Sequence, residues 1–349
     1  MAQLLIYGVT GYTGRLVLKE AIAKGLKPII AGRNLQKTQE LALEFGLEFR
    51  IFSLDGADSI APHIRSVNLV LHCAGPFALT ARPMMEACLH EKVHYIDITG
   101  EIGIMQWAYE RDAQAKSAGV MLMCGVGFDL VPTDCVAATL HKQLPDATDL
   151  EIGFYMHGGG ISHGTMRTMA MNLGNGSFER INHELVPVPL AHKGKIIDFG
   201  THQKFCMSIP WGDLFSAYLS TGIENIVTYT ASSKTTYHIL KFQRLLNPIF
   251  KSRVFKFLFN KYIDRYITGP TQEQNQQGRS FVWGKVSNTH GESKEALLEC
   301  AESYLLTALC SIHIAKKILD GNFLPGYQTP SAPYGEGLIL EIEGSRYLK

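Results

Sequence analysis

Residues 4–14 read LLIYGVTGYTG, and this stretch decides the fold of the first half of the chain. The apolar run 4–7 has the length of a buried strand, and glycines follow it at positions 8, 11 and 14. Gly8 permits a tight turn, Gly11 lets a pyrophosphate approach the backbone, and Gly14 lets the next helix pack closely on the strand. The start of that helix supplies free N–H groups and a positive dipole end. The spacing is GxxGxxG, and glycines also mark ordinary turns, so the flanking strand and helix carry the prediction of a dinucleotide-binding turn.

Five more apolar runs alternate with amphipathic stretches up to about Leu144, which is the pattern of strand–helix–strand units around a parallel sheet. These runs are residues 28–32, 48–54, 68–74, 94–98 and 120–126. Crossovers of this length are right-handed in nearly all proteins. The pattern therefore predicts an α/β fold with an N-terminal Rossmann doubly wound parallel sheet, whose ligand crevice lies at the carboxyl ends of the strands.

After Leu150 the pattern changes to a strand at 151–157 and then to a long segment that is rich in Thr, Tyr and Val and interrupted by glycines. This composition favours a second, antiparallel α+β substrate domain. Residues 295–320 have helical periodicity and predict one long helix. The predicted domains are 1–148, which binds NADP, and 149–349, which binds substrate or forms a dimer. Packing of the last segment back onto the first domain is left open.

The end of the second predicted strand reads Ala31-Gly32-Arg33-Asn34, where an NAD-binding protein usually offers an acidic residue to the ribose 2′-hydroxyl. An acid would repel a 2′-phosphate, whereas the Arg33 guanidinium can hold it through charge-assisted hydrogen bonds. The cofactor is therefore predicted to be NADP(H). The alternative is that Arg33 and Asn34 form only a solvated turn and a helix cap.

Two further loops follow predicted strands, at 73–77 and 97–101, and both are expected to line the cofactor. Small residues at 74 and 75 let the backbone pass close to the ribose and nicotinamide, and Pro76 fixes the turn. A helix cap is an equally weighted interpretation of residues 99–101. The residues predicted to bind the cofactor are Gly8, Thr10, Gly11, Tyr12, Thr13, Gly14, Arg33, Asn34, Ala74, Gly75, Pro76, Phe77, Thr99 and Gly100.

These short motifs occur in an order and spacing that resembles the saccharopine dehydrogenase-like oxidoreductases, including the trans-acting enoyl reductases. The motifs are GVTGYTG (8–14), AGR (31–33), CAGPF (73–77), YIDITGE (95–101) and GFDLVPTD (127–134), with a similar ending at 301–339. The resemblance covers the first domain well and is loose over about 175–290. It implies a Rossmann domain, NADP(H), and hydride transfer involving a small-molecule or acyl substrate. It supplies no catalytic residue, and family members differ in substrate, so the resemblance defines the cofactor better than the reaction.

A reductase of this kind needs a group that donates a proton or stabilises negative charge beside the nicotinamide. The sequence offers His163, with Ser162 as its hydrogen-bond partner, in a glycine-rich segment predicted to fold over the crevice. Asp129 or Thr133 is the alternative, on the loop after the sixth strand. Asp134 is expected to have a structural role as a helix cap.

Composition excludes several other classes of protein. Apolar residues make up 46% of the chain and charged residues 19%, which is typical of a folded globular protein, and the net charge of +1 provides no field for nucleic acid. Seven scattered cysteines without CxxC spacing, together with the absence of HExxH, predict no metal site and a reducing compartment. The N-terminal run ends at a glycine and lacks the features of a signal peptide, so a cytoplasmic location is expected.

Residues 234–265 contain eight lysines and arginines against one acid, interleaved with large apolar residues. One interpretation is an amphipathic helix that contacts an anionic membrane, or that grips an acyl- or phosphate-bearing carrier. The other, which the composition favours slightly, is a helical pair that packs on the core or on the partner in a homodimer. Tyr237 and Lys241 have the Tyr-x-x-x-Lys spacing of short-chain dehydrogenases, but they lie far beyond the sixth strand and are interpreted as a coincidence.

The function predicted from the sequence is therefore NADPH-dependent hydride transfer to a C=C, C=N or C=O bond, with an enoyl substrate as one option. A non-catalytic NADP-binding redox sensor, or a protein that docks on a membrane surface, is the alternative. Consumption of NADPH separates the two.

Overall fold

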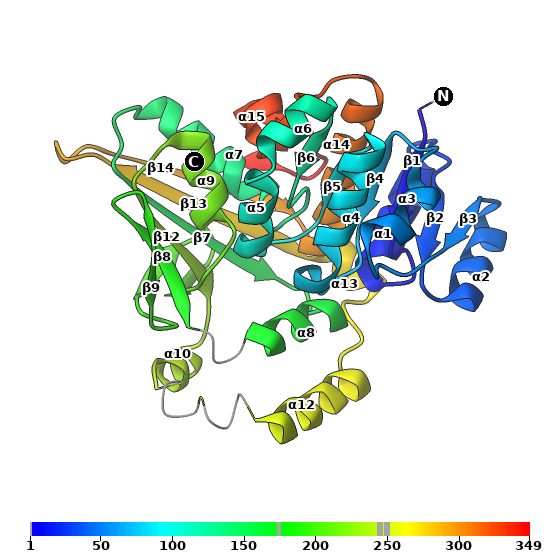
Figure 1. Ribbon diagram of the computed structural model, residues 1–349. Helices are drawn as coiled ribbons and strands as arrows, with labels where there is room; N and C mark the ends of the chain where they lie inside the picture. Colours follow the sequence, from blue (N-terminus) through cyan, green and yellow to red (C-terminus); the bar gives the residue numbers. More distant parts are fainter. Residues whose placement is uncertain (1, 173–175, 243–246, 248–251) are drawn as a thin grey trace. The chain divides into compact units, whose positions relative to one another are not determined.

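Seven parallel strands form the sheet of the N-terminal region in the computed structural model, which describes residues 2–172, 176–242, 247 and 252–349 (Figure 1). Their order across the sheet is β15-β6-β5-β4-β1-β2-β3. The strands are β1 Leu4–Tyr7, β2 Ile29–Gly32, β3 Phe49–Ile51, β4 Leu69–His72, β5 His94–Asp97, β6 Met121–Met123 and β15 Gly326–Tyr327. The first six are the predicted strands: β1 matches its apolar run and the other five are shorter than theirs. Their order is the doubly wound Rossmann order.

The chain runs outward from β1 in both directions, so β1 lies between β2 and β4 at the centre of the sheet. Leu5, Ile6, Ile30, Leu69 and Leu71 have no exposed surface, as expected for strands that are covered on both faces. The connecting helices are α1 Tyr12–Ala23, α2 Leu35–Phe45, α3 Ala57–Ile64, α4 Phe77–Glu91, α5 Ile102–Tyr109 and α6 Asp112–Ala118. Because strand order reverses between β1 and β4, a ligand crevice is expected at the carboxyl ends of these two strands.

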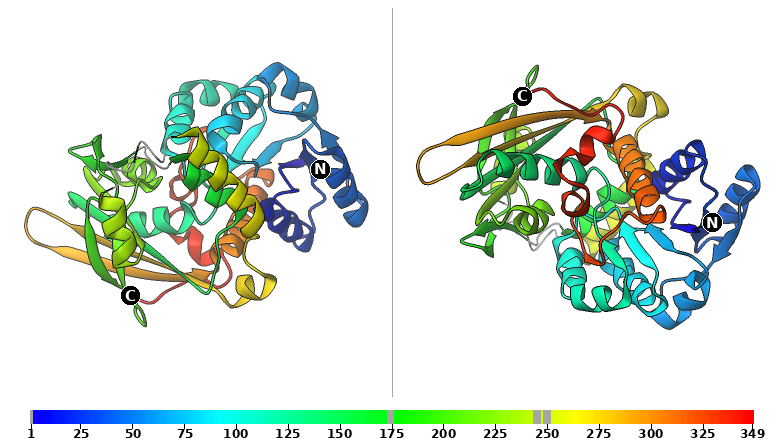
Figure 2. Two further views of the ribbon diagram at one scale, coloured as in Figure 1. Left: turned by 90° about the horizontal axis from the view of Figure 1, so that it is seen from below. Right: turned by 90° about the horizontal axis from the view of Figure 1, so that it is seen from above.

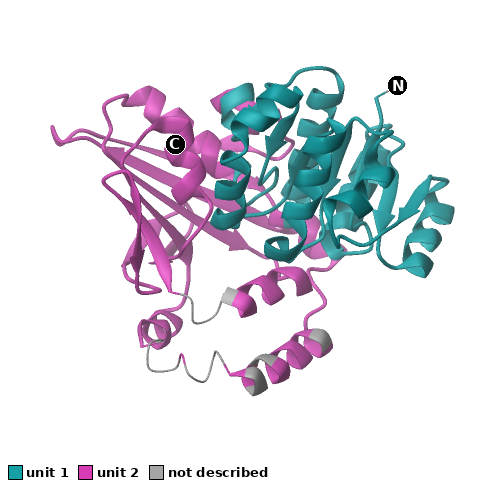
Figure 3. Cartoon of the chain, in the orientation of Figure 1, with its two compact units in different colours: residues 1–131, 304–334 teal, residues 132–303, 335–349 magenta. Residues whose placement is uncertain are grey.

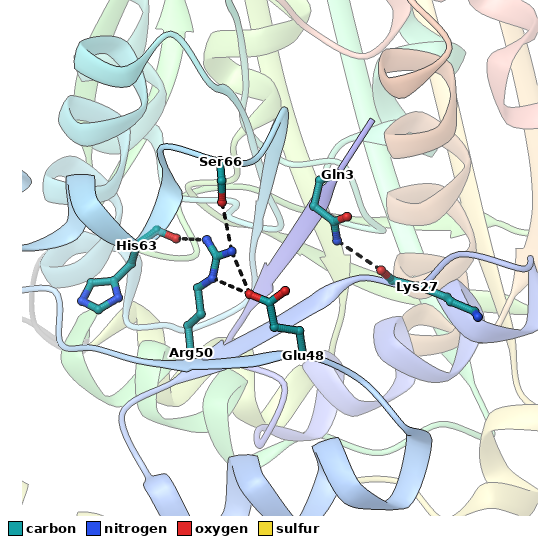
Figure 4. A network of polar contacts seen from close by, with 6 residues as sticks. All are labelled: Gln3, Lys27, Glu48, Arg50, His63 and Ser66. Carbon is teal, nitrogen blue, oxygen red and sulfur yellow. Dashed lines mark hydrogen bonds and ion pairs between the residues drawn. The ribbon is translucent and has the colours of Figure 1, made fainter. Parts of the chain in front are cut away.

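Arg50 on β3 holds the edge of this sheet to the end of α3 (Figure 4). Its guanidinium donates to the backbone oxygen of His63 at 2.5 Å, to Ser66 Oγ at 3.0 Å and to Glu48 Oε1 at 2.8 Å. A helix leaves its last carbonyls without partners within the helix, and Arg50 satisfies one of them. The arginine therefore has a structural role at the edge of the sheet.

A late segment of the chain completes this sheet. Helix α14 (Ser303–Leu319) contacts the loop after β6: Thr307 Oγ1 accepts from Phe128 N at 3.0 Å, and Ser311 Oγ donates to the Val126 oxygen at 3.2 Å. Strand β15 then pairs with β6. In the right-hand view of Figure 2, α14 is the orange helix. Helix α15 (Ser331–Tyr334) follows.

The chain therefore divides into two compact units that do not follow a single cut in the sequence (Figure 3). Unit 1 is residues 1–131 with 304–334, and unit 2 is residues 132–303 with 335–349. The division predicted from the sequence, at residue 148, rested on a change of hydrophobic pattern. That pattern does not show that residues 304–334 pack with unit 1.

Unit 2 contains a mixed sheet in the order β10-β11-β12-β7-β13-β14-β16, with β8 and β9 paired beside β12. Its strands are β7 Asp149–His157, β8 Ser177–Ile181, β9 Glu184–Val188, β10 Gly194–Asp198, β11 Gln203–Ser208, β12 Asn225–Ala231, β13 Arg279–Ser287, β14 Ser293–Ala301 and β16 Arg346–Tyr347. The neighbouring strands β7 and β12 are parallel, whereas the sequence predicted an antiparallel sheet. The chain between them is long enough for the crossover that a parallel pair requires.

The prediction of one helix over 295–320 was wrong in its first part. Residues 293–301 form β14, which pairs with β13 along its whole length, and α14 begins only at Ser303. Glu295–Ala301 contains good helix formers, but the ladder to β13 buries Leu298 and Cys300 completely. Tertiary pairing has overridden local propensity here.

The helices of unit 2 are α7 Val131–Gln143, α8 His163–Asn172, α9 Asp213–Thr221, α10 Lys234–Lys241, α12 Arg253–Tyr266, α13 Gln272–Gln277 and the 3-10 turn η1 Glu336–Glu341. Helix α7 packs so closely on β13 that a Cβ on Gly284 would lie 2.6 Å from Val136 Cγ1. Of the basic segment 234–265, residues 243–246 and 248–251 lie outside the described residues. Among the residues that are described, no helix combines the length and apolar character needed to cross a membrane.

Replacement of Gly14 by alanine is expected to destabilise unit 1. An added Cβ would lie 2.2 Å from the Gly8 carbonyl oxygen, so the start of α1 must move away from the turn. Overpacking of this kind costs about 1–3 kcal/mol of unfolding free energy, which chemical denaturation measures. The matched control is Gly103→Ala in α5, where no described residue outside the helix's own backbone comes within 4 Å of the new Cβ. Its stability should stay equal or rise by up to about 1 kcal/mol. Equal stability of the two variants would contradict the close packing.

Candidate nucleotide-binding site

The glycine turn after β1 is held by backbone contacts on both sides. Gly8 has a φ of +93°, a conformation that favours glycine, and its amide donates to the Ala31 oxygen at 2.8 Å. A Cβ on Gly8 would lie 2.8 Å from the Ala74 Cβ, so the loops after β1 and β4 touch at this point. The two loops that flank the switch point of the sheet therefore form one surface of small residues.

Helix α1 presents an N-terminus suited to an anion. Its cap residue is Gly11, which has no side chain to bond the first amides, and its first turn contains no acidic residue. The Arg15 amide donates to the Gly11 oxygen at 3.0 Å, whereas amides earlier in a helix have no acceptor within it. Thr13 and Gly14 lie in this first turn, and Tyr12 packs its ring edge-on against Tyr304, with centroids 5.1 Å apart.

Arg33 and Asn34 follow β2 and have different roles. Asn34 caps α2: its side chain accepts from the Lys37 amide at 2.9 Å. Arg33 is exposed, and within the described part of the chain its guanidinium has no hydrogen-bond or ion-pair partner. Burial raises the pKa of Tyr7 to about 12, and the positive charge of Arg33 opposes that rise. Asn34 thus has the cap role of the alternative interpretation, whereas Arg33 is available to a ligand.

A cavity of about 290 Å³ lies between α1 and α2, beside the glycine turn. Its lining residues are Thr10, Arg15, Lys37, Glu40, Leu41 and Glu44. Arg15 makes an ion pair with Glu44 at 3.2 Å, and the side chains of both are about half exposed. The sequence analysis missed Arg15 and Lys37. The signal available for Lys37 was its place in the first turn of the helix that Asn34 caps.

The loop after β4 is fixed by bonds to its carbonyl groups. The Ala74 oxygen accepts from Thr80 Oγ1 at 2.7 Å and lies 3.1 Å from His72 Nε2. Complete burial lowers the pKa of His72 to about 4, so the imidazole is neutral near pH 7. Gly75, Pro76 and Phe77 lead directly into α4, so this loop is short and firmly held.

The loop after β5 is organised around Asp97, which is fully buried. Its carboxylate accepts from the Thr99 and Gly125 amides, both at 3.0 Å, and from the Tyr95 hydroxyl at 2.8 Å. Burial nevertheless raises the pKa of Asp97 to about 6. Asp97 therefore joins the loop after β5 to the loop after β6.

Glu101 joins this loop to the one after β4. Its amide donates to Thr99 Oγ1 at 3.1 Å, and its carboxylate accepts from the Phe77 amide at 3.2 Å, at the start of α4. A carboxylate at a helix N-terminus is favoured by the helix dipole. Glu101 is the N-cap residue of α5, but its side chain makes no cap bond to that helix, and its carboxylate bonds the start of α4 instead.

Asp129 lies against this loop, because a Cβ on Gly100 would be 3.3 Å from the Asp129 Cβ. Desolvation raises the pKa of Asp129 to about 7, and the neighbouring charges of Asp97 and Glu101 add to the rise. Part of the side chain stays accessible, unlike that of Asp97. At pH 7 Asp129 is therefore protonated in a large fraction of molecules, which suits a proton donor.

The remaining candidates belong to unit 2. His163 is the first residue of α8 and follows the buried Ser162. Its catalytic role stays a prediction. Asp134 lies in the first turn of α7 and accepts from Ser220 on α9, so its structural bond is to another helix. Tyr237 packs against Phe205 and lies one turn before Lys241 on α10.

Among the described residues, no three His, Cys, Asp or Glu side chains gather in a way that could hold a metal ion.

Comparison with known proteins agrees with this geometry. Residues 4–123 match the family described as the saccharopine dehydrogenase NADP binding domain. Unit 1 therefore contains an NADP-binding domain of the saccharopine dehydrogenase type.

Individual relatives extend the match. The human saccharopine dehydrogenase-like oxidoreductase is 29% identical over 217 residues, which cover 54% of this chain and 50% of the relative. The trans-acting enoyl reductase of Mycobacterium leprae is 26% identical over 149 residues, covering 40% of this chain and 36% of the relative. Together with the domain match, these alignments make the chain similar to the saccharopine dehydrogenase-like oxidoreductases, with trans-acting enoyl reductases as more distant relatives. The resemblance predicted from the motifs is confirmed.

The fold has a counterpart in a solved structure. The apo saccharopine dehydrogenase (L-Glu forming) of Saccharomyces cerevisiae has a TM-score of 0.65 and 11% identity, with both chains covered in full. This likeness confirms the predicted α/β fold with its second sheet domain. The chain spans about half the length of the human relative that it matches.

The raised pKa of Asp129 predicts a pH-dependent stability. An unfolded aspartate has a pKa of about 3.9, so the contribution of Asp129 to folding is fully present below that pH and is lost as the pH rises through about 7. Asp129→Asn cannot ionise, so its unfolding free energy should rise relative to the wild type between pH 5 and pH 8. Urea denaturation at the two pH values measures this difference. Asp149→Asn, at an exposed end of β7, is the control, and an equal pH trend in both variants would contradict the assignment.

Proposed function

We propose that this protein is an NADPH-dependent reductase that transfers hydride to a C=C, C=N or C=O bond of a small-molecule or acyl substrate. The observation that carries the proposal is the exposed Arg33, a cation without a partner among the described residues, at the carboxyl end of β2. Its place beside the glycine turn and the N-terminus of α1 matches the needs of a phosphorylated dinucleotide.

The residues of unit 1 fit such a cofactor. The pyrophosphate would be held by the amides at the start of α1, where Gly11 provides no competing side chain. The 2′-phosphate would be held by Arg33, with Thr10, Arg15 and Lys37 supplying further polar groups around the neighbouring cavity. A volume of about 290 Å³ is at the lower end for ligand pockets and suits one part of a dinucleotide better than the whole.

The preference for NADPH over NADH follows from charge. Two arginines and a lysine, Arg15, Arg33 and Lys37, lie in or near the site, and the loop at the end of β2 offers no carboxylate. Glu40 and Glu44 line the cavity, but Arg15 neutralises Glu44. A 2′-phosphate would therefore gain charge-assisted bonds, which an unphosphorylated ribose lacks.

When bound, NADPH supplies the hydride, and the protein must supply a proton or stabilise negative charge. Asp129 is suited to donate the proton, since its raised pKa keeps the carboxyl partly protonated at pH 7. Asp97 and Glu101 are positioning residues: they hold the loops on either side of Asp129 and raise its pKa. His163 remains the other candidate donor.

An unsaturated acyl substrate is proposed first, because distant relatives are named trans-acting enoyl reductases. Substrates with C=N bonds are the second group, because the structurally similar yeast enzyme is named a saccharopine dehydrogenase. A cofactor-binding protein without turnover would bind NADPH but would not consume it with any substrate.

Replacement of Arg33 by alanine is expected to weaken NADPH binding about 10- to 100-fold, as a lost charge-assisted bond predicts, with little effect on NADH. Titration of the purified protein, followed by nicotinamide fluorescence, measures both constants. Arg65→Ala removes an exposed arginine that pairs with Glu91 and serves as the control. Equal loss of NADPH and NADH affinity in Arg33→Ala, or no binding to the wild type, would overturn the cofactor assignment.

The protonated form of Asp129 should be the active form, so kcat/KM for NADPH oxidation should fall as the pH rises above about 7. Asp129→Asn should lower kcat by about a hundredfold or more while NADPH binding is retained. The same measurement on His163→Asn discriminates between the candidates. A loss confined to His163→Asn would transfer the role to that residue.

A further inference from the structure

Helix α12 of unit 2 exposes two adjacent rows of side chains that are spaced four residues apart. Phe257, Lys261 and Arg265 form one row, and Leu258, Tyr262 and Tyr266 form the other. Residues four apart lie on one face of a helix, so the rows run side by side. Phe257, Leu258, Tyr262 and Tyr266 are exposed by 58%, 59%, 52% and 61%, and both cations are exposed too. We call these six residues the α12 surface.

The opposite face of the helix attaches it to unit 2. Ile263 is fully buried and Phe255 and Phe259 are partly buried, while α12 packs against α8 (Figure 1). Core packing therefore explains this inner row and leaves the α12 surface unexplained. Soluble proteins rarely expose so many large apolar side chains together without a partner.

The α12 surface is also positively charged. The helix sequence contains four basic residues, Arg253, Lys256, Lys261 and Arg265, against the single acid Asp264, whereas the whole chain has a net charge of only +1. Lys261 Nζ lies 4.9 Å from the centroid of the Phe257 ring, and Arg265 Cζ lies 5.7 Å from that of Tyr266. Cations and aromatic rings thus share one face and would meet the same partner.

Other helices of unit 2 have the same character. Helix α10 exposes Ile239 by 53% and Phe242 by 62% beside the exposed Lys241, and α8 exposes Met169 by 53%. These residues extend the combination of large apolar and basic side chains beyond one helix.

We infer that the α12 surface docks the protein onto an anionic phospholipid membrane. Aromatic and leucine side chains at the headgroup level, flanked by lysine and arginine, are the features of helices that lie in a membrane interface. The positive charge selects anionic lipids, and each basic residue near such a surface adds to binding. The exposed rows of α12 can lie flat on a bilayer, because binding to a planar surface requires no groove in the protein. This inference does not depend on the proposed reduction.

The test is flotation of the full-length protein with vesicles of phosphatidylcholine alone or with 30% phosphatidylserine. The wild type should float with the anionic vesicles at low salt, should bind neutral vesicles much more weakly, and should lose binding as salt rises. Two double variants separate the contributions: Phe257→Ser with Leu258→Ser removes apolar contact, and Lys261→Glu with Arg265→Glu reverses charge. Each should weaken binding to anionic vesicles at least tenfold.

The matched control is Leu43→Ser with Leu79→Ser, which alters leucines of unit 1 that are exposed by 77% and 67%. It should bind vesicles as the wild type does. All variants should keep the wild-type unfolding temperature and NADPH affinity, so failure of membrane docking is distinguishable from failure of the nucleotide site.

Three results would overturn the inference. The first is absence of wild-type binding to anionic vesicles, and the second is equal loss in the control variant. The third is a dimer in sedimentation equilibrium that the Phe257→Ser, Leu258→Ser variant dissociates, because the α12 surface would then cover a second copy of the chain.

Discussion

The backbone of the glycine turn allows no side chain at two positions, and unit 1 is arranged around that constraint. Gly14 must approach the Gly8 carbonyl, and Gly8 must approach Ala74, so α1, β1 and the loop after β4 are mutually fixed. Gly11, which lies between these two glycines, leaves the start of α1 without a side-chain cap at the switch point of the sheet. Gly8 and Gly14 thus provide the close packing, and Gly11 leaves free amides for an anion.

A second layer of the candidate site is built from two carboxyl groups, the fully buried Asp97 and the partly buried Glu101. Asp97 bonds the loops after β5 and β6, and Glu101 bonds the loop after β5 to the start of α4. Both acids stabilise loop geometry through amide donors, and both oppose ionisation of Asp129. The carboxylates that hold the loops therefore also raise the pKa of Asp129. This arrangement is consistent with the tendency of perturbed pKa values to gather at functional sites.

The sequence predicted the six leading strands, their parallel order and the glycine turn, and it placed the cation Arg33 directly after the second strand, because each of these depends on local pattern. It did not predict β14, since Glu295–Ala301 has helical propensity that only the ladder with β13 overrides. The roles of Asp97 and Glu101 depend on contacts between loops, and Arg15 and Lys37 share a cavity only after α1 and α2 have packed. Such contacts leave no periodic signal in the chain. For α12, composition indicated an amphipathic helix, but only the structure separates the row that packs inward from the two rows that face outward.

The pairing of β15 with β6 has a consequence for biosynthesis. The edge of β6 is complete at residue 123, but the strand that covers it begins at residue 326, after all the strands of unit 2 except β16. While the chain between them is being translated, the edge of β6 has no paired strand and its apolar residues are exposed. Such edges are sites of unwanted strand pairing. We therefore expect chaperones to protect the N-terminal sheet of the nascent chain until β15 has been synthesised.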